Sequence, residues 1–520
     1  MSPKPLTLLL LVTLLAALPS SAAVSIFLLS AGSSAPVLPG TRVSWELSAR
    51  RSFGSGNEAT DISVALPVSA FMSNVSIAGD RWTCSTSSTI LCTTSLAAAA
   101  DSTPLRLSFD TPSSSDGGRF IATATMTSSA TNTHPGIAAQ IVAEVYRTFA
   151  VTTADDFGAG SLRDAIALAN ERCDRSVYCL MTFESPMTIE PRAPLPAVTA
   201  CNLTIDGGLA RAASQDSERP VEISGVKAGW SNGFEIRSWC GVSLRGLTIN
   251  SFSENGIVLA ASKAPAPLGQ ATLYVEDCFI GTDTKASQAR PNGMRGISIE
   301  TPATVASIRN NTISGNRYSG IAVWAAASAD ISACRIGAGR DLRPLGNGGS
   351  GVFVNGGEVS VNSTVAYNRD FGVTVGPDAA DVVAEIEGLF ANGVLDFDWG
   401  LDGAVRTDRF GHMPPVPELI DATYDPAHNT TIIRGVLPAH GRRSGSFQYS
   451  VRIFELAAGR YIAQWPQTNL FATANGDLPF TMSVSGDLRG RPLVAQSFFY
   501  LFPDLPAYDS SEVSVPVVAR

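Results

Sequence analysis

The sequence predicts an all-β protein in which a solenoid of stacked coils lies between two β-sandwich domains. Three observations lead to this prediction. Asn-x-x-x-Gly followed by Ile or Val recurs in the middle of the chain, as NGMRGISI, NRYSGIAV, NGGSGVFV and NRDFGVTV. The composition is rich in Gly, Ser, Thr, Val and Ala, which favours strands and turns. The segments on both sides of the repeat alternate apolar and polar residues, as half-buried strands do.

Residues 1–23 have the pattern of a secretory signal peptide. Lys4 precedes an apolar run from Leu6 to Leu18, and small residues lead to a predicted cleavage after Ala23. No other run reaches the roughly 18 apolar residues that span a bilayer, so we expect no transmembrane segment in the mature chain.

Residues 24–148 predict the first β-sandwich. Stretches such as RVSWELS and LRLSFD alternate, and the length of the segment suits an immunoglobulin-like sandwich. The phrases VLPGTRVSWEL and WTCSTSSTILCTTSL also resemble a bacterial surface repeat of this type. That resemblance implies a disulfide between Cys84 and Cys92 and a role as a spacer.

Residues 149–405 predict the solenoid, which begins with a short amphipathic helix. Ser161 follows a GAG turn and is a good N-cap. The apolar stripe consists of Leu162, Ala165, Ile166 and Ala169. We expect this helix to cover the open end of the coil stack, with Arg163 and Asp164 bracing the cap rather than taking part in catalysis.

The stretch VTTADDFGAGSLRDAIALAN, the pairs LTIDG and VSLRGLTI, and the phrases IGTD at Ile280 and IGAG at Ile336 carry a family resemblance. They resemble a family of secreted bacterial right-handed parallel β-helix proteins with a Ser-Leu-Arg-Asp/Glu-Ala-Ile (CSLREA-type) entrance motif. The resemblance covers about half of the chain. It implies a pectate-lyase-like solenoid and export to the periplasm, the cell surface or the outside of a bacterium. The family has no single chemistry, so no reaction is implied.

The recurrent Asn and Gly residues are predicted to form the turns of the coils. The paired positions are Asn292 and Gly296, Asn316 and Gly320, Asn347 and Gly351, and Asn368 and Gly372. We expect each Gly to occupy a tight bend that favours positive φ. The Asn side chains can hydrogen-bond to the backbone and stack into a ladder. Their predicted role is structural, with direct ligand binding as the alternative.

A second column of β-branched residues fixes the expected register of the coils. It contains Val275, Ile308, Ile331 and Val361, which lead the phrases VEDCFI, IRNNTI, ISACRI and VNSTVA. Coils stacked at about 4.8 Å would bury their inward residues in one continuous core. We therefore expect one interior file of Ile297, Ile321, Val352 and Val373.

Export permits disulfides, and the sequence contains eight cysteines. Cys173 and Cys179 form a local pair. Cys201 and Cys240 open the matching phrases CNLTIDG and CGVSLRG, which as adjacent coils would bring their Cα atoms within disulfide range. Cys278 and Cys334 are separated by the coil of Asn311, and we expect both to be buried free thiols. The cysteine spacings do not match a zinc site.

Residues 406–520 predict a second sandwich, from alternating stretches such as FQYSVRIFEL. Just before it, LDFDWGLDG places Asp396, Asp398 and Asp402 at a spacing that suits a Ca²⁺ ion. The segment lacks the downstream Glu of an EF-hand loop, so a solvated turn is favoured over a metal site. Apart from this Ca²⁺, we expect no cofactor.

Trp230, Trp239 and Trp324 are candidate ligand-binding residues, because they lie on or beside predicted coil strands. An outward Trp offers a flat apolar face and an N–H to a sugar ring. Burial beneath a loop is the alternative.

The charge balance and the outward column guide the functional prediction. A formal charge of −9 argues against binding of nucleic acid, which needs clustered basic residues. The predicted outward column contains Arg245, Glu276, Arg309, Ser332 and Asn362, which suits a ladder of solvated ion pairs better than an acid site.

The favoured function is that of an exported, non-catalytic surface or extracellular binding or adhesion protein, with polysaccharide or a cell-envelope component as its partner. The alternatives are a polysaccharide lyase or glycoside hydrolase that uses a β-helix face, and a purely structural spacer.

Overall fold

The computed structural model describes most of the chain. The described residues are 26–31, 35–51, 60–96, 102–128, 137–208, 218–260, 271–301, 304–324, 328–384, 388–399, 415–438, 448–456, 460–471, 477–500, 509–511 and 514–520. The predicted cleavage after Ala23 and the predicted metal ligand Asp402 lie outside them. Within these residues, no helix is long and apolar enough to cross a membrane.

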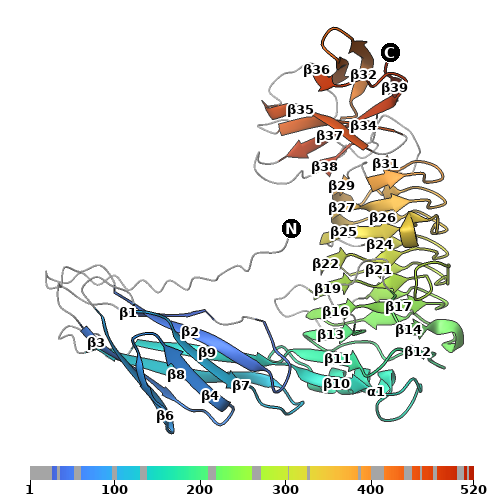
Figure 1. The fold of residues 1–520 in the computed structure, drawn as a ribbon. Helices are drawn as coiled ribbons and strands as arrows, with labels where there is room; N and C mark the ends of the chain where they lie inside the picture. The colour runs from blue at the N-terminus through green and yellow to red at the C-terminus, as the bar shows by residue number, and fades with distance from the viewer. Residues whose placement is uncertain are drawn as a thin grey trace. The chain divides into compact units, whose positions relative to one another are not determined.

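The chain divides into two compact units, Met1–Tyr146 and Arg147–Arg520. The first unit contains two antiparallel sheets (Figure 1). One sheet consists of β1 (Ile26–Ala31), β2 (Arg42–Arg51), β7 (Leu105–Asp110) and β4 (Ser73–Gly79). The other consists of β5 (Thr83–Ser85), β6 (Thr89–Leu96), β3 (Thr60–Pro67), β8 (Gly118–Ser128) and β9 (Ile137–Val145). The predicted alternation is visible in β7, where Leu105, Leu107 and Phe109 are buried in the shared core.

The second unit is a stack of coils whose strands run parallel and form three faces. The first face contains β10 (Arg147–Val151), β11 (Cys179–Phe183), β13 (Leu203–Asp206), β16 (Gly241–Arg245), β19 (Ala271–Glu276), β22 (Thr304–Arg309), β25 (Ser328–Ile336), β27 (Gly357–Ala366) and β29 (Ala379–Ala384). The second contains β12 (Met187–Ile189), β14 (Val221–Ser224), β17 (Leu247–Asn250), β20 (Phe279–Ile280), β23 (Thr312–Ile313), the ends of β25 and β27, and β30 (Leu389–Phe390). The third contains β15 (Phe234–Ile236), β18 (Ile257–Leu259), β21 (Ile297–Ile299), β24 (Ile321–Val323), β26 (Val352–Val354), β28 (Val373–Val375) and β31 (Phe397–Trp399).

This arrangement is a parallel β-helix, and it confirms the predicted fold class. The predicted interior file of Ile297, Ile321, Val352 and Val373 is formed in register on the third face, and all four side chains are fully buried. Val275, Ile308, Ile331 and Val361 likewise pair in succession on the first face.

A helix stands at the entrance of the coil stack. Helix α1 (Leu162–Arg172) buries its apolar stripe in the same core, and the Ser161 hydroxyl accepts a hydrogen bond from the Asp164 N–H. Arg163 binds the Asp156 carboxylate at 2.7 Å and donates to the Pro194 carbonyl at 2.7 Å. Both contacts tie the helix to neighbouring loops.

The positive φ expected for the repeat glycines is wrong. Gly296, Gly320, Gly351 and Gly372 are absent from the glycines with positive φ. Each is instead required because the next coil approaches closely. A Cβ on Gly320 would lie 2.8 Å from the Gly351 carbonyl oxygen and 2.9 Å from the Asn347 amide nitrogen. Left-handed residues occur at another bend, between the first and second faces, at Asp277, Asn310 and Ala333.

The Asn residues form a buried side-chain ladder. The Nδ2 groups of Asn292, Asn316, Asn347 and Asn368 each donate to the Oδ1 atom of the Asn one coil further on, at 2.9, 3.0, 2.9 and 3.0 Å. Each Nδ2 also lies within hydrogen-bond distance of a strand carbonyl, as Asn347 does with Ile313 at 3.0 Å. The ladder continues to Asn392, which the repeat pattern does not include because no Gly follows four residues later.

The cysteines lie as the sequence predicts. Cys84–Cys92, Cys173–Cys179 and Cys201–Cys240 are at disulfide distance. Cys278 and Cys334 are free and buried on either side of Asn311, which accepts a hydrogen bond from the Cys278 N–H at 2.8 Å. Burial raises the pKa of the Cys278 thiol to about 12 and that of Cys334 to about 11.

The end of the second unit is a pair of antiparallel sheets. One consists of β32 (Glu418–Asp425), β33 (Thr430–Leu437) and β36 (Leu478–Ser485). The other consists of β35 (Arg460–Phe471), β34 (Gln448–Glu455), β37 (Pro492–Tyr500), β38 (Asp509–Ser510) and β39 (Val517–Val518). Phe454, Val494 and Phe498 join the β-helix core, and Gln496 donates to the Ala384 carbonyl at 3.0 Å. These contacts cover the last coils as α1 covers the first.

Candidate ligand-binding face

The predicted metal ligands separate into two different environments. Asp396 accepts a hydrogen bond from Asn392 Nδ2 at 2.8 Å and so forms the end of the Asn ladder. Asp398 is fully buried in β31. Among the described residues, no group of three or more His, Cys, Asp or Glu side chains could hold a metal ion. Because Asp402 lies outside them, the Ca²⁺ site stays a prediction.

The three candidate tryptophans do not lie together. Trp230 is 76% exposed in the turn before β15. Trp239 follows β15 and is half-buried, with the Arg175 guanidinium 3.8 Å from its ring centre. Trp324 is 38% exposed and follows β24. Trp230 and Trp239 flank β15, and strands β18 and β21 separate that coil from the coil of β24, which carries Trp324.

Trp324 instead lies against an aromatic residue of the next coil. Its ring centre lies 4.9 Å from that of Phe353 in β26. Tyr318, 55% exposed, belongs to the turn that precedes β24. The charge of Tyr318 acts on Arg295, whose guanidinium lies over the Trp324 ring, and we call Tyr318, Trp324 and Phe353 the aromatic platform. Trp and Tyr side chains combine a flat apolar surface with a polar tip, a combination that suits a ring-shaped polar ligand.

Arg295 completes this surface. Its guanidinium carbon lies 4.8 Å from the centre of the Trp324 ring, within the range of a cation–π contact. Arg295 precedes β21 and Trp324 follows β24, so the contact spans the outer side of these strands. The outward residues there are the small Ser298 and Ala322, which are fully buried.

The electrostatic environment of Arg295 is mixed. Burial lowers the pKa of its guanidinium, while the nearby charges of Glu300 and Tyr318 act in the opposite direction. Glu300 follows β21, and its carboxylate accepts a hydrogen bond from Ser298 Oγ at 2.8 Å. One cation and one carboxylate therefore stand beside the aromatic platform.

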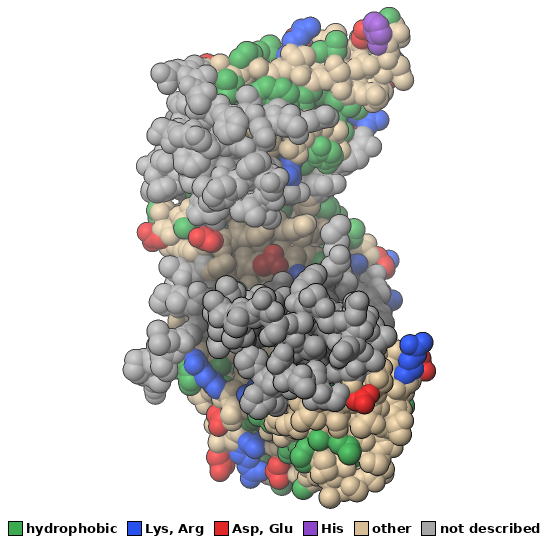
Figure 2. Space-filling view, turned by 90° about the vertical axis from the view of Figure 1, so that its left-hand side faces the viewer, with side chains coloured by type: hydrophobic (Ala, Val, Ile, Leu, Met, Phe, Trp, Pro, Cys, Tyr) green, Lys and Arg blue, Asp and Glu red, His purple; other side chains and the backbone are tan. Residues whose placement is uncertain are grey.

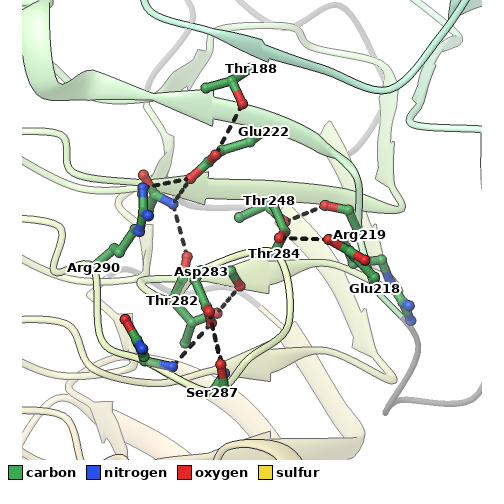
Figure 3. Close-up of polar contacts among 12 residues, drawn as sticks. Thr188, Glu218, Arg219, Glu222, Thr248, Thr282, Asp283, Thr284, Ser287 and Arg290 are labelled. Carbon is green, nitrogen blue, oxygen red and sulfur yellow. Dashed lines mark hydrogen bonds and ion pairs between the residues drawn. The ribbon is translucent and has the colours of Figure 1, made fainter.

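A second polar cluster lies on the second face, around Glu222 (Figure 3). Its buried carboxylate accepts hydrogen bonds from Asn250 at 2.7 Å and Thr188 at 3.2 Å, and pairs with Arg290 at 3.4 Å. Asn250 also donates to the Thr282 carbonyl at 2.8 Å, which ties the strand to the loop that follows β20. The cluster therefore holds the loop against the coils.

That loop also organises its own polar groups. Burial alone would raise the pKa of Asp283, but hydrogen bonds from the Gln288 and Ser287 N–H groups and from the Ser287 hydroxyl hold it below its usual value. The Arg219 backbone N–H donates to the Thr284 carbonyl at 2.8 Å. The loop is thus fixed by contacts within the chain.

Arg219 itself is fully buried. Its guanidinium lies 4.7 Å from the centre of the Phe279 ring and 4.0 Å from the Asp277 carboxylate, and burial lowers its pKa. Sequence reasoning missed Arg219, Glu222 and Arg290. Of these three, only Glu222 could have been noticed in the sequence, because it is a charged residue in the strand VEIS, whose other residues are apolar or small.

The first face carries the predicted outward column. Arg245, Glu276, Arg309, Ser332 and Asn362 follow one another in register. Arg245 pairs with Glu276 at 3.4 Å, and Arg309 pairs with Asp330 at 3.8 Å. In the side view of Figure 2, acidic and basic side chains are interspersed on the described surface. Ion pairs of this kind near the surface contribute little to stability. Because acidic and basic residues alternate, the pairs give this face no uniformly positive or negative potential.

Comparison with known proteins defines the class of the central coils. Residues 232–385 match the family model described as right handed beta helix region. The matched segment runs from the coil of β15 to the end of β29 and includes the aromatic platform. Together with the parallel register, the match makes this part of the chain a right-handed parallel β-helix. No curated protein matches the sequence.

Proposed function

We propose that this protein is an exported, non-catalytic module that binds carbohydrate on the third face of its β-helix. The aromatic platform carries the proposal. Tyr318 and Trp324 flank β24 of one coil and are both partly exposed, and the charged side chains of Arg295 and Glu300 lie nearby. Sugar rings have apolar faces that stack on aromatic rings and hydroxyl groups that need hydrogen-bonding partners.

The scaffold beneath the platform supports this function. The turn that carries Tyr318 begins at Asn316, whose amide is held in the buried ladder by Asn292 and Asn347. A binding surface that is already ordered loses less conformational entropy when the ligand arrives. The platform therefore suits recognition of an extended polymer by a preformed face.

Export is part of the proposal. The predicted signal peptide and the resemblance to secreted bacterial β-helix proteins support it, and three disulfides suit an oxidising compartment. The flanking β-domains would then hold the β-helix away from a bacterial surface or from other parts of an extracellular assembly. The predicted immunoglobulin-like character of residues 24–148 belongs to this proposal.

A polysaccharide screen with the mature chain tests the function, read for both binding and product formation. The variant Trp324→Ala should weaken binding by about tenfold or more, because stacking area and the contact with Arg295 are lost together. Trp230→Ala is the matched control, since Trp230 is more exposed but lies outside the platform. Thermal unfolding of both variants shows whether either change disturbs the fold.

Two outcomes would contradict the proposal. If Trp230→Ala abolishes binding while Trp324→Ala leaves it intact, the platform is not the site. If unsaturated or reducing-end sugars accumulate with the wild-type protein, the protein is a polysaccharide-degrading enzyme.

A further inference from the structure

A groove lies between two edge strands of the C-terminal sheets. β35 is the last strand of one sheet and β36 the last strand of the other (Figure 1). The Trp465 and Phe480 rings join the two strands, with their centres 5.3 Å apart. The groove has a volume of about 560 Å³ and is lined by consecutive residues of both strands, 461–465 and 481–485. Because successive residues of a strand point to opposite faces, this lining means that the groove follows the strand edges.

The register of β36 shows which of its backbone groups face away from its neighbour β33. In an antiparallel pair, residue pairs that exchange hydrogen bonds alternate with pairs that do not. The Gly486 N–H donates to the Asn429 carbonyl at 2.8 Å, and these two residues continue the register of the β33–β36 ladder. The even-numbered residues of β36 therefore bond to β33. The N–H and C=O groups of Thr481, Ser483 and Ser485 point to the free edge.

This edge has no partner in the part of the chain that the structure describes. Among the described strands, β36 pairs with β33 alone. The side chains of Thr481, Ser483 and Ser485 are exposed, so solvent reaches the edge. A row of unpaired backbone groups on an accessible strand is a template for another strand.

The edge also lacks the features that usually protect edge strands, which are charges, prolines and bulges. The opposite edge of the same sheet, β32, has them. It carries Glu418, Asp421 and Asp425, its register shifts, and its backbone bonds to Arg520. β36 contains no charged residue and no register shift. Its one proline, Pro479, occupies an outward position, where the missing N–H costs no bond to β33.

The lining of the groove indicates the chemistry of an added strand. None of the described residues that line it is charged. Met482 and Val484 pack with Ile462 in the core between the sheets, while Thr481 and Ser483 are exposed. A strand beside β36 would place its side chains on the same two sides in alternation. A charge directed inward would lose water without gaining a partner.

We propose that the free edge of β36 binds an extended polypeptide segment of a partner protein, which adds to the sheet as a further strand. The segment is uncharged on its inward side and alternates apolar with small polar residues. Backbone hydrogen bonds to Thr481, Ser483 and Ser485 supply the affinity, and the alternating side chains supply the specificity. This site is separate from the aromatic platform and does not depend on carbohydrate binding.

The test is fluorescence anisotropy of the mature chain with three labelled peptides. The first is a heptapeptide of alternating Thr and Val with blocked ends. The second has the same sequence with alternate backbone nitrogens methylated, which removes the N–H groups that pair with a strand. The third has its central Val replaced by Glu. We expect the first peptide to bind, and the other two to bind at least about tenfold more weakly.

Ser483→Pro removes the middle outward N–H of the edge but none of the bonds to β33. It should weaken binding of the first peptide by about tenfold or more. Ser483→Ala is the matched control, because it keeps the backbone and should change binding by less than about twofold. Thermal unfolding shows whether either variant disturbs the fold, and the methylated peptide tests the same hydrogen bonds on the wild type.

The proposal is overturned if the wild type does not bind the first peptide, or binds the methylated peptide equally well. Unchanged binding in a folded Ser483→Pro variant also overturns it. Equal binding of the Glu-containing peptide contradicts the stated chemistry of the segment. If sedimentation shows that the wild type self-associates and that Ser483→Pro does not, the edge belongs to an interface between two copies of this chain instead.

Discussion

Gly320 illustrates how single residues set the spacing of the coils. Its backbone lies so close to the next coil that a methyl group would meet the Gly351 carbonyl, the Ile336 side chain and the Asn347 amide, all within 2.9 Å. Two of these groups belong to the backbone or to the buried ladder, and neither can move without disturbing neighbouring coils. The glycine is needed for space, and its φ is ordinary.

Gly320→Ala should therefore lower the free energy of unfolding of the β-helix by about 2 kcal/mol, the usual range for overpacking a buried site. Urea unfolding followed by circular dichroism measures the change. Gly241→Ala is the control, because Gly241 has ordinary φ and nothing lies within 4 Å of the position its Cβ would take. Equal stability of the two variants would show that close approach does not explain the glycine column.

At the scale of the structural element, the Asn ladder joins the coils through side chains as well as strands. Each amide links two neighbouring coils and a strand carbonyl, and Asn292, Asn316, Asn347 and Asn368 are all buried. A buried polar group is stabilising only when its partners are present. The ladder therefore acts as a unit, in which each Asn supplies a hydrogen-bonding partner to the next Asn.

Asn347→Ala removes the central member of the ladder. The variant leaves the Asn316 amide, the Asn368 oxygen and the Ile313 carbonyl each without one hydrogen-bonding partner in a buried site. We expect a loss of about 3 kcal/mol in the free energy of unfolding, from unmade hydrogen bonds and a small cavity. Asn362→Ala is the control, since Asn362 is exposed on the first face and should change stability by less than about 0.5 kcal/mol. A similar loss in both variants would contradict a special role for the ladder.

At the scale of the whole molecule, the second unit contains what the proposed function needs. Its core extends from Phe149 in β10 to Phe498 in β37 and includes the residues of α1. The platform, the ladder and the closing contacts at both ends of the coils all lie within Arg147–Arg520. A unit with its own core and covered ends can fold alone.

A chain that carries only residues 147–520 should therefore fold and bind the same sugars as the mature protein, with affinity within about twofold. Thermal unfolding and glycan binding, compared with those of the mature chain, measure this. If the shortened chain folds but loses binding, the first unit contributes to recognition, and the platform alone is not the site.

Much of the fold could be predicted from the sequence because its information is local and periodic. Alternating apolar residues define strands, and the recurrence of Asn and Gly in four successive coils reveals their register. Cys201 and Cys240 could be paired for the same reason, since equivalent positions of adjacent coils stack. The φ of the repeat glycines could not be predicted, because a turn and a close approach both select for glycine.

The candidate site could be predicted only in part. The sequence by itself determined that Trp324 ends a coil strand and that its neighbours form an ordered stack, because those properties follow from the repeat. Only the tertiary structure decided which tryptophan has aromatic partners and that Arg295 lies over it. The physical reason is that the coils differ in length, so the side chains that meet across the outer side of the strands share no fixed spacing in the sequence.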